Sequence, residues 1–290
     1  MANSKILILR EKQNQYFLKY TNGNIQPMYK ERKNVITKIL FKILFKFNSD
    51  FLFIFLEDWK KEINNYEKVI IFDSGYRSIV SKYIRIKNKK CKIILYFWNI
   101  VKDNNKKILQ DKNITEIWTF DNEDSLKYNI KLNQQFYTKN ITLPMVKEEN
   151  DVYFLGKNKG RKQEIQKIEK KLKEYGVKTK FIVLEENSKK QISYEEYLKE
   201  IQNTKAILDV SEKKQKGLTL RCLEALFLHK KLITTNMDIC KFDFYNKNNI
   251  FIIGKDDIKD IIKFINSEYY HISEKIINYY DFENWIKRFE

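Results

Sequence analysis

The sequence predicts an α/β protein with two doubly wound domains in tandem, each built on a parallel β-sheet. Short apolar runs typical of buried strands alternate with longer segments that have room for crossover helices, which is the pattern of a parallel sheet covered on both faces. This alternation restarts near residue 151, after Pro144 and an acidic cluster. With 43% hydrophobic residues and only 7 glycines and 2 prolines in 290 residues, the chain has a globular composition with few flexible linkers.

Four apolar runs in the first half are predicted strands. Each is short, rich in β-branched or aromatic residues, and bounded by polar residues. The segment 74–87, between the second and third runs, is long enough for a crossover helix. The runs are KILILR (5–10), KVIIFD (68–73), CKIILYFW (91–98) and TEIWTFD (115–121).

The segment NVITKILFKILFKF (34–47) is a predicted helix with a basic stripe. Lys38, Lys42 and Lys46 follow i, i+4 spacing and occupy an arc of roughly 80°, with apolar residues around the rest. Such a helix can lie in the interface of an anionic membrane, and it equally fits a core helix with one solvated stripe. The lysines and Asp50 interrupt the apolar region 39–56, so a transmembrane span is not predicted.

The second half repeats the pattern of the first. The boundary is expected in ITLPMVKEEND (141–151), which gives domains 1–146 and 147–290; a single sheet of about ten strands is the alternative. An aromatic-rich helical tail follows residue 267. The predicted strands are DVYFLG (151–156), TKFIVL (179–184), KAILDVS (205–211), KLITTN (231–236) and NIFIIG (249–254).

The net charge of +18, from 56 basic and 38 acidic residues, raises the question of nucleic acid as a partner. Abundant Lys, Asn, Ile, Tyr and Phe are what an AT-rich genome imposes on any protein, so much of the excess lysine is expected to be solvated surface. The charge therefore indicates only a general attraction for anions. No CxxC spacing and no signal-peptide core are found, and a cytoplasmic setting is expected.

The stretch KGLTLRCLEALFLHKKLITTN (216–236) reads as a helix followed by a strand. Apolar residues cover most of the helix, and Gly217, Arg221 and Glu224 share one seam at i, i+4, i+7 spacing. In one interpretation, Arg221 and Glu224 pair with each other or with a neighbouring loop. In the other, the seam faces a cleft, where Glu224 accepts hydrogen bonds from a sugar and the helix start binds an anion. The helix follows a predicted strand, and ligands of open α/β sheets bind outside the carboxyl ends of strands.

A predicted strand ends in Asp and Ser and is followed by a glycine-containing loop, GLTLRCLEAL, a basic turn and KLITTN. This arrangement resembles the C-terminal domain of GT-B glycosyltransferases, especially bacterial enzymes of lipopolysaccharide and capsular polysaccharide synthesis. The resemblance implies two Rossmann-like domains, with acceptor bound by 1–146 and nucleotide-sugar donor by 147–290. It implies that Glu224 binds the donor ribose, that Gly217, Leu218 and Thr219 present amides to its diphosphate, and that Arg221 is a supporting or ligand-contacting cation. It also implies a C-terminal helix that crosses back to the first domain; a helix capping the second domain is the alternative.

A second loop is similar to the first βα unit of the GT-B donor domain. A predicted strand ends at Gly156, a loop holds Lys157, Lys159, Gly160 and Arg161, and a long amphipathic helix follows. In the family this loop helps to hold the donor phosphates. On its own it is neither a Walker P-loop nor G-x-G-x-x-G, and a lysine-rich surface turn is the alternative.

The catalytic base is expected in the first half. Asp73 ends KVIIFD, where a strand-end carboxylate faces the cleft, and it is equally suited to cap the following helix. Asp121 has the same two interpretations. His229 and His271 do not form a metal-binding pattern, so a metal-independent enzyme without a cofactor is expected, the nucleotide-sugar being a substrate.

The predicted function is hexosyl transfer from a nucleotide-sugar to a glycan or lipid-linked glycan acceptor, by a protein that binds no nucleic acid. Residues 34–47 would provide contact with an anionic membrane, on the inner face of the cell membrane. Two alternatives stay open: an inactive GT-B-like partner protein, and a basic nucleic-acid-binding protein, although no RNP-like motif or concentrated basic arm is present.

Overall fold

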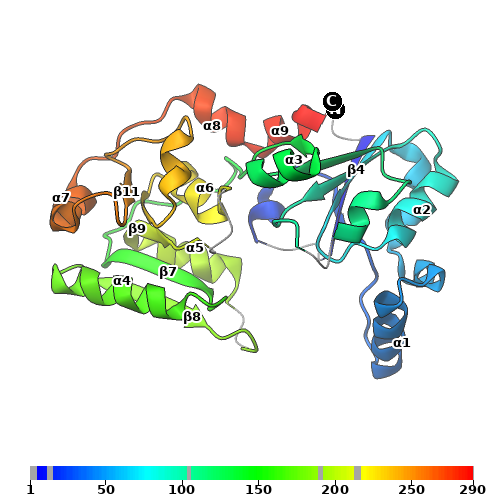
Figure 1. The fold of residues 1–290 in the computed structure, drawn as a ribbon, viewed down its shortest axis with the longest axis horizontal. Coiled ribbons are helices and arrows are strands. Elements are labelled where there is room, and N and C mark those ends of the chain that lie inside the picture. The colour runs from blue at the N-terminus through cyan, green and yellow to red at the C-terminus, as the bar shows by residue number, and fades with distance from the viewer. Residues whose placement is uncertain (1–4, 12–15, 103–105, 189–191, 212–216, 290) are drawn as a thin grey trace. The chain divides into compact units, whose positions relative to one another are not determined.

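The computed structural model describes residues 5–11, 16–102, 106–188, 192–211 and 217–289. The chain divides into two compact units, residues 1–133 and 134–290, and each contains a parallel β-sheet (Figure 1). The predicted α/β class with two parallel sheets is confirmed. The division precedes the boundary expected at 146, because Phe136 and Tyr137 pack within unit 2.

The sheet of unit 1 has the strand order β2-β1-β3-β4-β5-β6. Its four predicted strands are all present, and two short edge strands are added. β2 ends in Pro27, which an edge strand tolerates because its missing N–H is not needed for pairing. Within the described residues the strands are β1 Ile6–Arg10, β2 Ile25–Pro27, β3 Lys68–Phe72, β4 Lys92–Phe97, β5 Glu116–Thr119 and β6 Lys131–Leu132.

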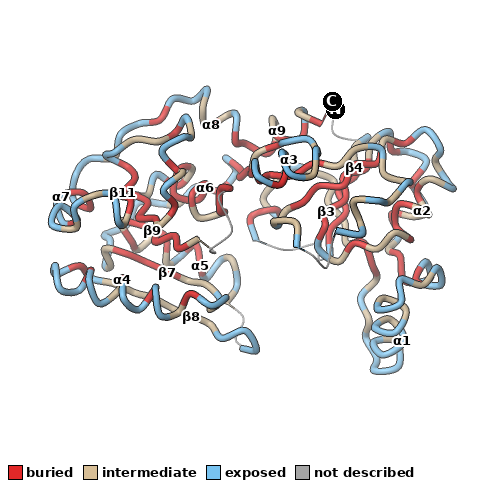
Figure 2. The backbone as a smooth tube through the Cα atoms, viewed as in Figure 1, coloured by how far each residue is buried: buried red, intermediate tan, exposed pale blue. Residues whose placement is uncertain are grey.

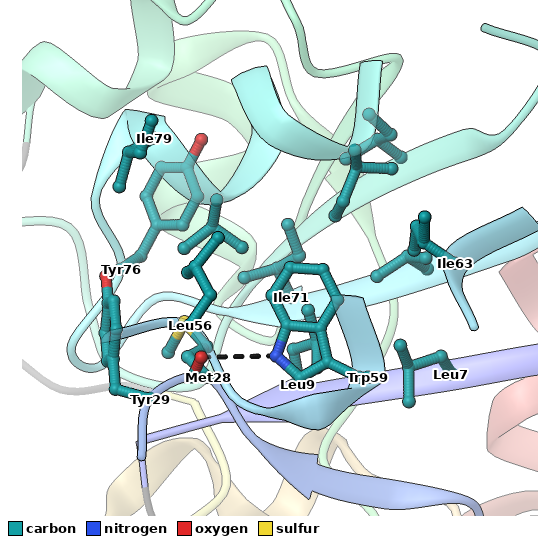
Figure 3. Close-up of a cluster of buried hydrophobic side chains, with 14 of the residues drawn as sticks. Leu7, Leu9, Met28, Tyr29, Leu56, Trp59, Ile63, Ile71, Tyr76 and Ile79 are labelled. Atoms are coloured by element: carbon teal, nitrogen blue, oxygen red, sulfur yellow. Dashed lines mark hydrogen bonds between the residues drawn. The ribbon is translucent and has the colours of Figure 1, made fainter. Parts of the chain in front are cut away.

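The core of unit 1 lies between the sheet and two segments, residues 28–66 before β3 and residues 76–84 after it. Figure 3 shows Leu7, Leu9 and Ile71 of the sheet against Trp59 and Met28. The Trp59 indole N–H donates to the Met28 carbonyl oxygen at 3.2 Å, so this buried polar atom has a partner. The described helices of unit 1 are α1 Val35–Lys46, α2 Ser78–Lys87 and α3 Asn122–Tyr128, with 3₁₀ turns at Tyr16–Tyr20, Asp50–Phe55, Asp58–Lys61, Ile63–Asn65 and Lys106–Gln110.

The helix predicted over 34–47 is present as α1, and Asn34 caps it by accepting from the Thr37 N–H at 2.8 Å. None of its residues is buried. Its interpretation as a core helix is therefore wrong. None of the helices in the described part of the chain is long and apolar enough to cross a membrane.

The sheet of unit 2 has the order β11-β10-β9-β7-β8, all parallel. All five of its predicted strands are confirmed. Its described strands are β7 Asn150–Lys157, β8 Thr179–Leu184, β9 Thr204–Asp209, β10 Lys231–Thr234 and β11 Ile250–Ile252, and its helices are α4 Lys162–Glu174, α5 Tyr194–Gln202, α6 Leu220–Phe227, α7 Ile261–Asn266, α8 Glu274–Tyr280 and α9 Phe282–Trp285, with 3₁₀ turns at Met237–Lys241, Ile258–Asp260 and Ile286–Phe289.

Helices cover both faces of the sheet of unit 2. Val152 and Phe154 point to the face that is covered by apolar residues of α4 and α7. Tyr153 points the other way, because side chains alternate along a strand, and its ring lies 5.9 Å from that of Tyr197 in α5. The sheet is therefore doubly wound, as the sequence predicts.

The aromatic tail packs on the first residues of unit 2. The rings of Phe136 and Trp285 stack with centroids 3.9 Å apart, and Phe282 adds a second contact with Phe136. The Tyr137 N–H donates to the Tyr280 carbonyl at 2.9 Å, and the Phe282 N–H donates to the Tyr137 carbonyl at 2.9 Å. The contact partners of the tail thus lie in residues that the sequence-based division assigned to the first domain and that the structure includes in unit 2.

Candidate anion-binding site

The strand order of unit 2 defines where a ligand of a doubly wound sheet binds. β7 is followed by β8 on one side, and then the chain returns to the other side as β9, so the winding direction reverses between β7 and β9. The two crossover helices leave a crevice at the carboxyl ends of the two strands that flank such a reversal. The predicted residue Gly156 lies near the end of β7 and Arg161 follows this strand, while Arg221 and Glu224 follow β9.

The turn after β7 directs Arg161 back toward β9. Lys159 and Gly160 adopt positive φ angles of 46° and 74°, which reverse the chain before α4 begins. The Arg161 guanidinium donates to the Val210 carbonyl, just beyond the end of β9, and lies 5.7 Å from the ring centroid of Phe154. The side chain of Arg161 is buried, and the turn is held in shape by the Arg161 N–H, which donates to the Asn158 carbonyl at 2.9 Å.

Arg221 reaches the same place from α6. Its Nη2 donates to the Leu155 carbonyl of β7 at 2.6 Å, and its guanidinium lies 4.9 Å from the ring centroid of Phe154. A Cβ atom added to Gly156 would lie 2.7 Å from Nη2 of Arg221 and 3.2 Å from Nη2 of Arg161. We call the group Phe154, Gly156, Arg161 and Arg221 the arginine cradle. Two guanidiniums thus converge beside a residue without a side chain, and guanidiniums are suited to bind the oxygens of an anion.

Asp209 binds the residue before α6, Thr219, and lies close to Arg221 of the cradle. Its carboxylate is fully buried and accepts from the hydroxyls of Thr219 at 2.9 Å and Thr234 at 3.0 Å. Nη1 of Arg221 lies 3.8 Å from the same carboxylate. Because the Thr219 hydroxyl is used in this way, it does not cap α6, which begins at Leu220. The N–H groups of the first turn of α6 are therefore left without a side-chain cap.

Glu224 lies in a buried network with three tyrosines. Its two carboxylate oxygens accept from Tyr194 at 2.8 Å and Tyr197 at 2.6 Å, and the Tyr194 hydroxyl lies 2.7 Å from that of Tyr137. Burial raises the pKa of Glu224 and of Tyr194 and Tyr197, so the tyrosine hydroxyls stay protonated and donate. Among the described contacts no ion pair joins Glu224 to Arg221, which rules out the direct pairing considered from the sequence.

The structure brings together some of the predicted residues and separates others. Gly156, Arg161 and Arg221 meet in the cradle. Thr219 lies beneath it, and Gly217 and Leu218 are buried in the loop before α6, so the first helical amides are those of the following residues. Lys157, Lys159 and Gly160 lie exposed at the turn, where the Lys159 N–H donates to Glu186 at 2.6 Å. Glu224 is 2% exposed, and Tyr194 and Tyr197 already occupy its oxygens.

Sequence reasoning missed Asp209, Tyr194 and Tyr197 as parts of this region. Asp209 ends the run KAILD, and a strand-end carboxylate followed by a glycine-containing loop is a recognisable signal. The tyrosines come three residues apart at the start of a helix whose capping box, Ser193 with Glu196, is visible in the sequence. That spacing places both on one helix face.

In unit 1, Asp73 lies at the end of a strand that flanks the reversal of the winding, as Asp209 does in unit 2. The winding of the sheet of unit 1 reverses between β1 and β3, and Asp73 follows β3 directly. Its carboxylate accepts from the Trp98 N–H at 2.8 Å, and α2 begins only at Ser78, so the helix-cap interpretation is wrong. Asp121, in contrast, does cap its helix by accepting from the N–H groups of Glu123 and Asp124.

Burial raises the pKa of Asp73 from 3.8 to about 6, against the opposing effect of hydrogen bonds from Trp98 and Asn99. A carboxyl group with a pKa near neutrality is suited to act as a general base. The neighbouring Arg10 is also buried and lies over the rings of Phe72 and Trp98, and desolvation lowers its pKa to about 10.

The stability of unit 1 is expected to fall as the pH rises from about 4 to about 6. The folded state holds the Asp73 proton more tightly than the unfolded state, so this stabilisation is complete below pH 3.8 and is lost through pH 6, roughly 3 kcal/mol in all. Asp73→Asn should abolish this decline in urea unfolding measured against pH. Asp58→Asn is the control, because hydrogen bonds from Lys61 and Lys30 lower the pKa of Asp58 and its effect has the opposite sign. An unchanged decline in Asp73→Asn would contradict the assignment.

Among the described residues, no group of three or more His, Cys, Asp or Glu side chains is arranged to hold a metal ion. No protein-family model matches the chain, and no curated protein matches its sequence. The site is therefore interpreted from its own geometry and from the residues that resemble the GT-B pattern.

Proposed function

We propose that the protein is a glycosyltransferase that takes a sugar from a nucleoside diphosphate sugar bound by unit 2. The observation that carries the proposal is the arginine cradle, in which one guanidinium from the turn after β7 and one from α6 flank Gly156 at the point where the winding of the sheet reverses. A diphosphate offers oxygens to both guanidiniums, and the uncapped first turn of α6 adds amide donors. The same groups would stabilise the charge that develops on the departing diphosphate.

The proposal extends to the acceptor and the class of enzyme. The acceptor is a glycan or lipid-linked glycan hydroxyl, and no metal or cofactor takes part. Asp73 is the candidate base, supported by its position after β3 and by a pKa of about 6. Glu224 remains the predicted ribose ligand, and the hydroxyl of Tyr194 would have to move for a ribose to reach it.

A thermal-shift screen against UDP, GDP, CDP, CMP and their sugar conjugates tests the proposal. A ligand that binds only the folded state raises the melting temperature, and we expect one nucleotide to do so selectively. Gly156→Ala places a methyl group where the anion and the guanidiniums meet and should weaken this binding by about tenfold or more.

Gly176→Ala is the matched control. Gly176 has a φ of +81° with open space around its Cβ position, so alanine costs about 1 kcal/mol of stability and should leave the ligand shift intact. If no nucleotide shifts the melting temperature, or if both variants lose the shift equally, the proposed donor site is wrong. Selective binding without sugar transfer to any glycan acceptor would instead favour an inactive partner protein.

A further inference from the structure

An exposed apolar surface lies on unit 1, in residues separate from Asp73 and its neighbours. Nearly half of the exposed large apolar side chains in the described chain fall between residues 35 and 54, in α1, at its C-cap Phe47 and in the 3₁₀ turn Asp50–Phe55. Figure 2 shows α1 exposed along most of its length, and Ile36 is 78% and Phe51 70% accessible. We call this surface the α1 face; it consists of Val35, Ile36, Ile39, Leu40, Ile43, Phe47, Phe51, Phe53 and Ile54.

α1 packs on unit 1 through one narrow side. Its partly buried residues Phe41, Leu44 and Phe45 contact the core of unit 1. At about 100° per residue, the exposed residues 35, 36, 39, 40 and 43 occupy an arc of roughly 140° on the opposite side. An amphipathic surface helix normally buries its apolar stripe and exposes its polar one. On α1 an apolar stripe faces outward as well, and an exposed apolar surface of this kind is typical of a binding site for a partner.

The helix is fixed in this orientation by contacts at its packed side. Arg77 donates to the Phe45 carbonyl at 2.9 Å and lies 3.6 Å from the centroid of the Phe45 ring. Phe41 is packed edge-on against Tyr29 and Phe55, with ring centroids 5.3 Å apart in each pair. The outward apolar stripe is therefore a stable property of unit 1.

The charged side chains of α1 itself are all basic. Lys38, Lys42 and Lys46 lie along one edge of the apolar arc, and no acidic residue occurs between 32 and 49. The first acidic residue that follows, Asp50, is paired with Lys82. Long lysine side chains beside an apolar stripe can extend their ammonium groups to phosphates while their stems remain in an apolar layer.

We propose that the α1 face docks unit 1 on the surface of an anionic lipid bilayer. The apolar side chains enter the boundary between headgroups and acyl chains, and the three lysines contact the headgroups. Pairing of the face with a second copy of itself would bring the lysine rows of two helices together without acidic partners. Docking through the α1 face does not depend on the proposed sugar transfer.

Flotation of the full chain with vesicles tests the proposal. We expect binding to vesicles of phosphatidylcholine with phosphatidylglycerol, weak binding to phosphatidylcholine alone, and a decline in binding as salt is raised. Lys38→Glu/Lys42→Glu/Lys46→Glu should reduce binding at least a hundredfold, since each lysine near an anionic surface contributes roughly a fivefold effect. Ile36→Asp/Ile39→Asp should reduce binding at least tenfold by removing the inserted side chains.

Two matched variants separate the α1 face from net charge and general hydrophobicity. Lys167→Glu/Lys170→Glu/Lys171→Glu changes the charge equally on the exposed side of α4, and Leu126→Asp changes an exposed apolar residue of α3; both should bind as the parent does. Hydrogen exchange of residues 35–54 should slow on binding. Failure of the parent to bind anionic vesicles, equal loss in the α4 variant, or a self-association that Ile36→Asp/Ile39→Asp abolishes would overturn the proposal.

Discussion

Replacing Asp209 by alanine is expected to lower the free energy of unfolding of unit 2 by about 3–5 kcal/mol. The carboxylate is fully buried and joins three elements, through Thr219 before α6, Thr234 of β10 and its own strand β9. Its loss leaves two buried hydroxyls without their acceptor and removes the nearest carboxylate from Arg221, 3.8 Å away.

Urea unfolding, with hydrogen exchange of the β9 and β10 amides as the reporter for unit 2, measures this effect. Asp257→Ala is the control, because Asp257 is exposed and its side chain caps a 3₁₀ turn by accepting from the Lys259 N–H, and loss of this cap should cost about 1 kcal/mol. A cost for Asp209→Ala no larger than that of the control would show that the buried carboxylate does not hold α6 to the sheet.

Glu224→Ala is expected to destabilise unit 2 by about 2–4 kcal/mol. The substitution leaves a cavity and removes the acceptor of the Tyr197 hydroxyl, whereas the Tyr194 hydroxyl still lies 2.7 Å from that of Tyr137. Glu224→Ala is therefore a poor test of ribose binding, because lost nucleotide affinity could result from lost structure. Glu224→Gln keeps one acceptor oxygen and should cost less.

A rescue experiment distinguishes the hydrogen-bond network from simple packing. Glu224→Leu combined with Tyr194→Phe and Tyr197→Phe removes both the acceptor and its donors while keeping most of the volume. We expect this triple variant to recover much of the stability lost by Glu224→Leu alone, measured by the same unfolding assay. If the losses simply add, the tyrosine hydroxyls do not depend on Glu224.

The sequence was sufficient for most of the fold because buried parallel strands are short, continuous apolar runs. KVIIFD and KAILDVS contain β3 and β9 nearly to the residue. The run FLFIFL (51–56) shows the limit, since it forms a 3₁₀ turn with only some side chains buried. Composition alone does not distinguish a short apolar run that joins a sheet from one that packs at its edge.

The sequence predicted which residues lie at the candidate site, but not the directions or the hydrogen-bond partners of their side chains. Strand ends and a glycine-containing loop located Gly156, Arg161 and Arg221 on the correct edge of the sheet. The directions of their side chains depend on tertiary contacts, such as the Phe154 ring that both guanidiniums approach and the Leu155 carbonyl that accepts a hydrogen bond from Arg221. The tyrosines around Glu224 come from another helix, and no local pattern near Glu224 indicates them.

The packing of Phe136 and Tyr137 against Phe282 and Trp285 has a consequence for the order in which the protein is made. These partners are separated by nearly the whole of unit 2, so this contact forms only after synthesis has passed residue 285. The sheet of unit 1 is complete at Leu132 and can assemble while unit 2 is still being translated. During that interval, apolar rings that are later buried remain accessible to chaperones.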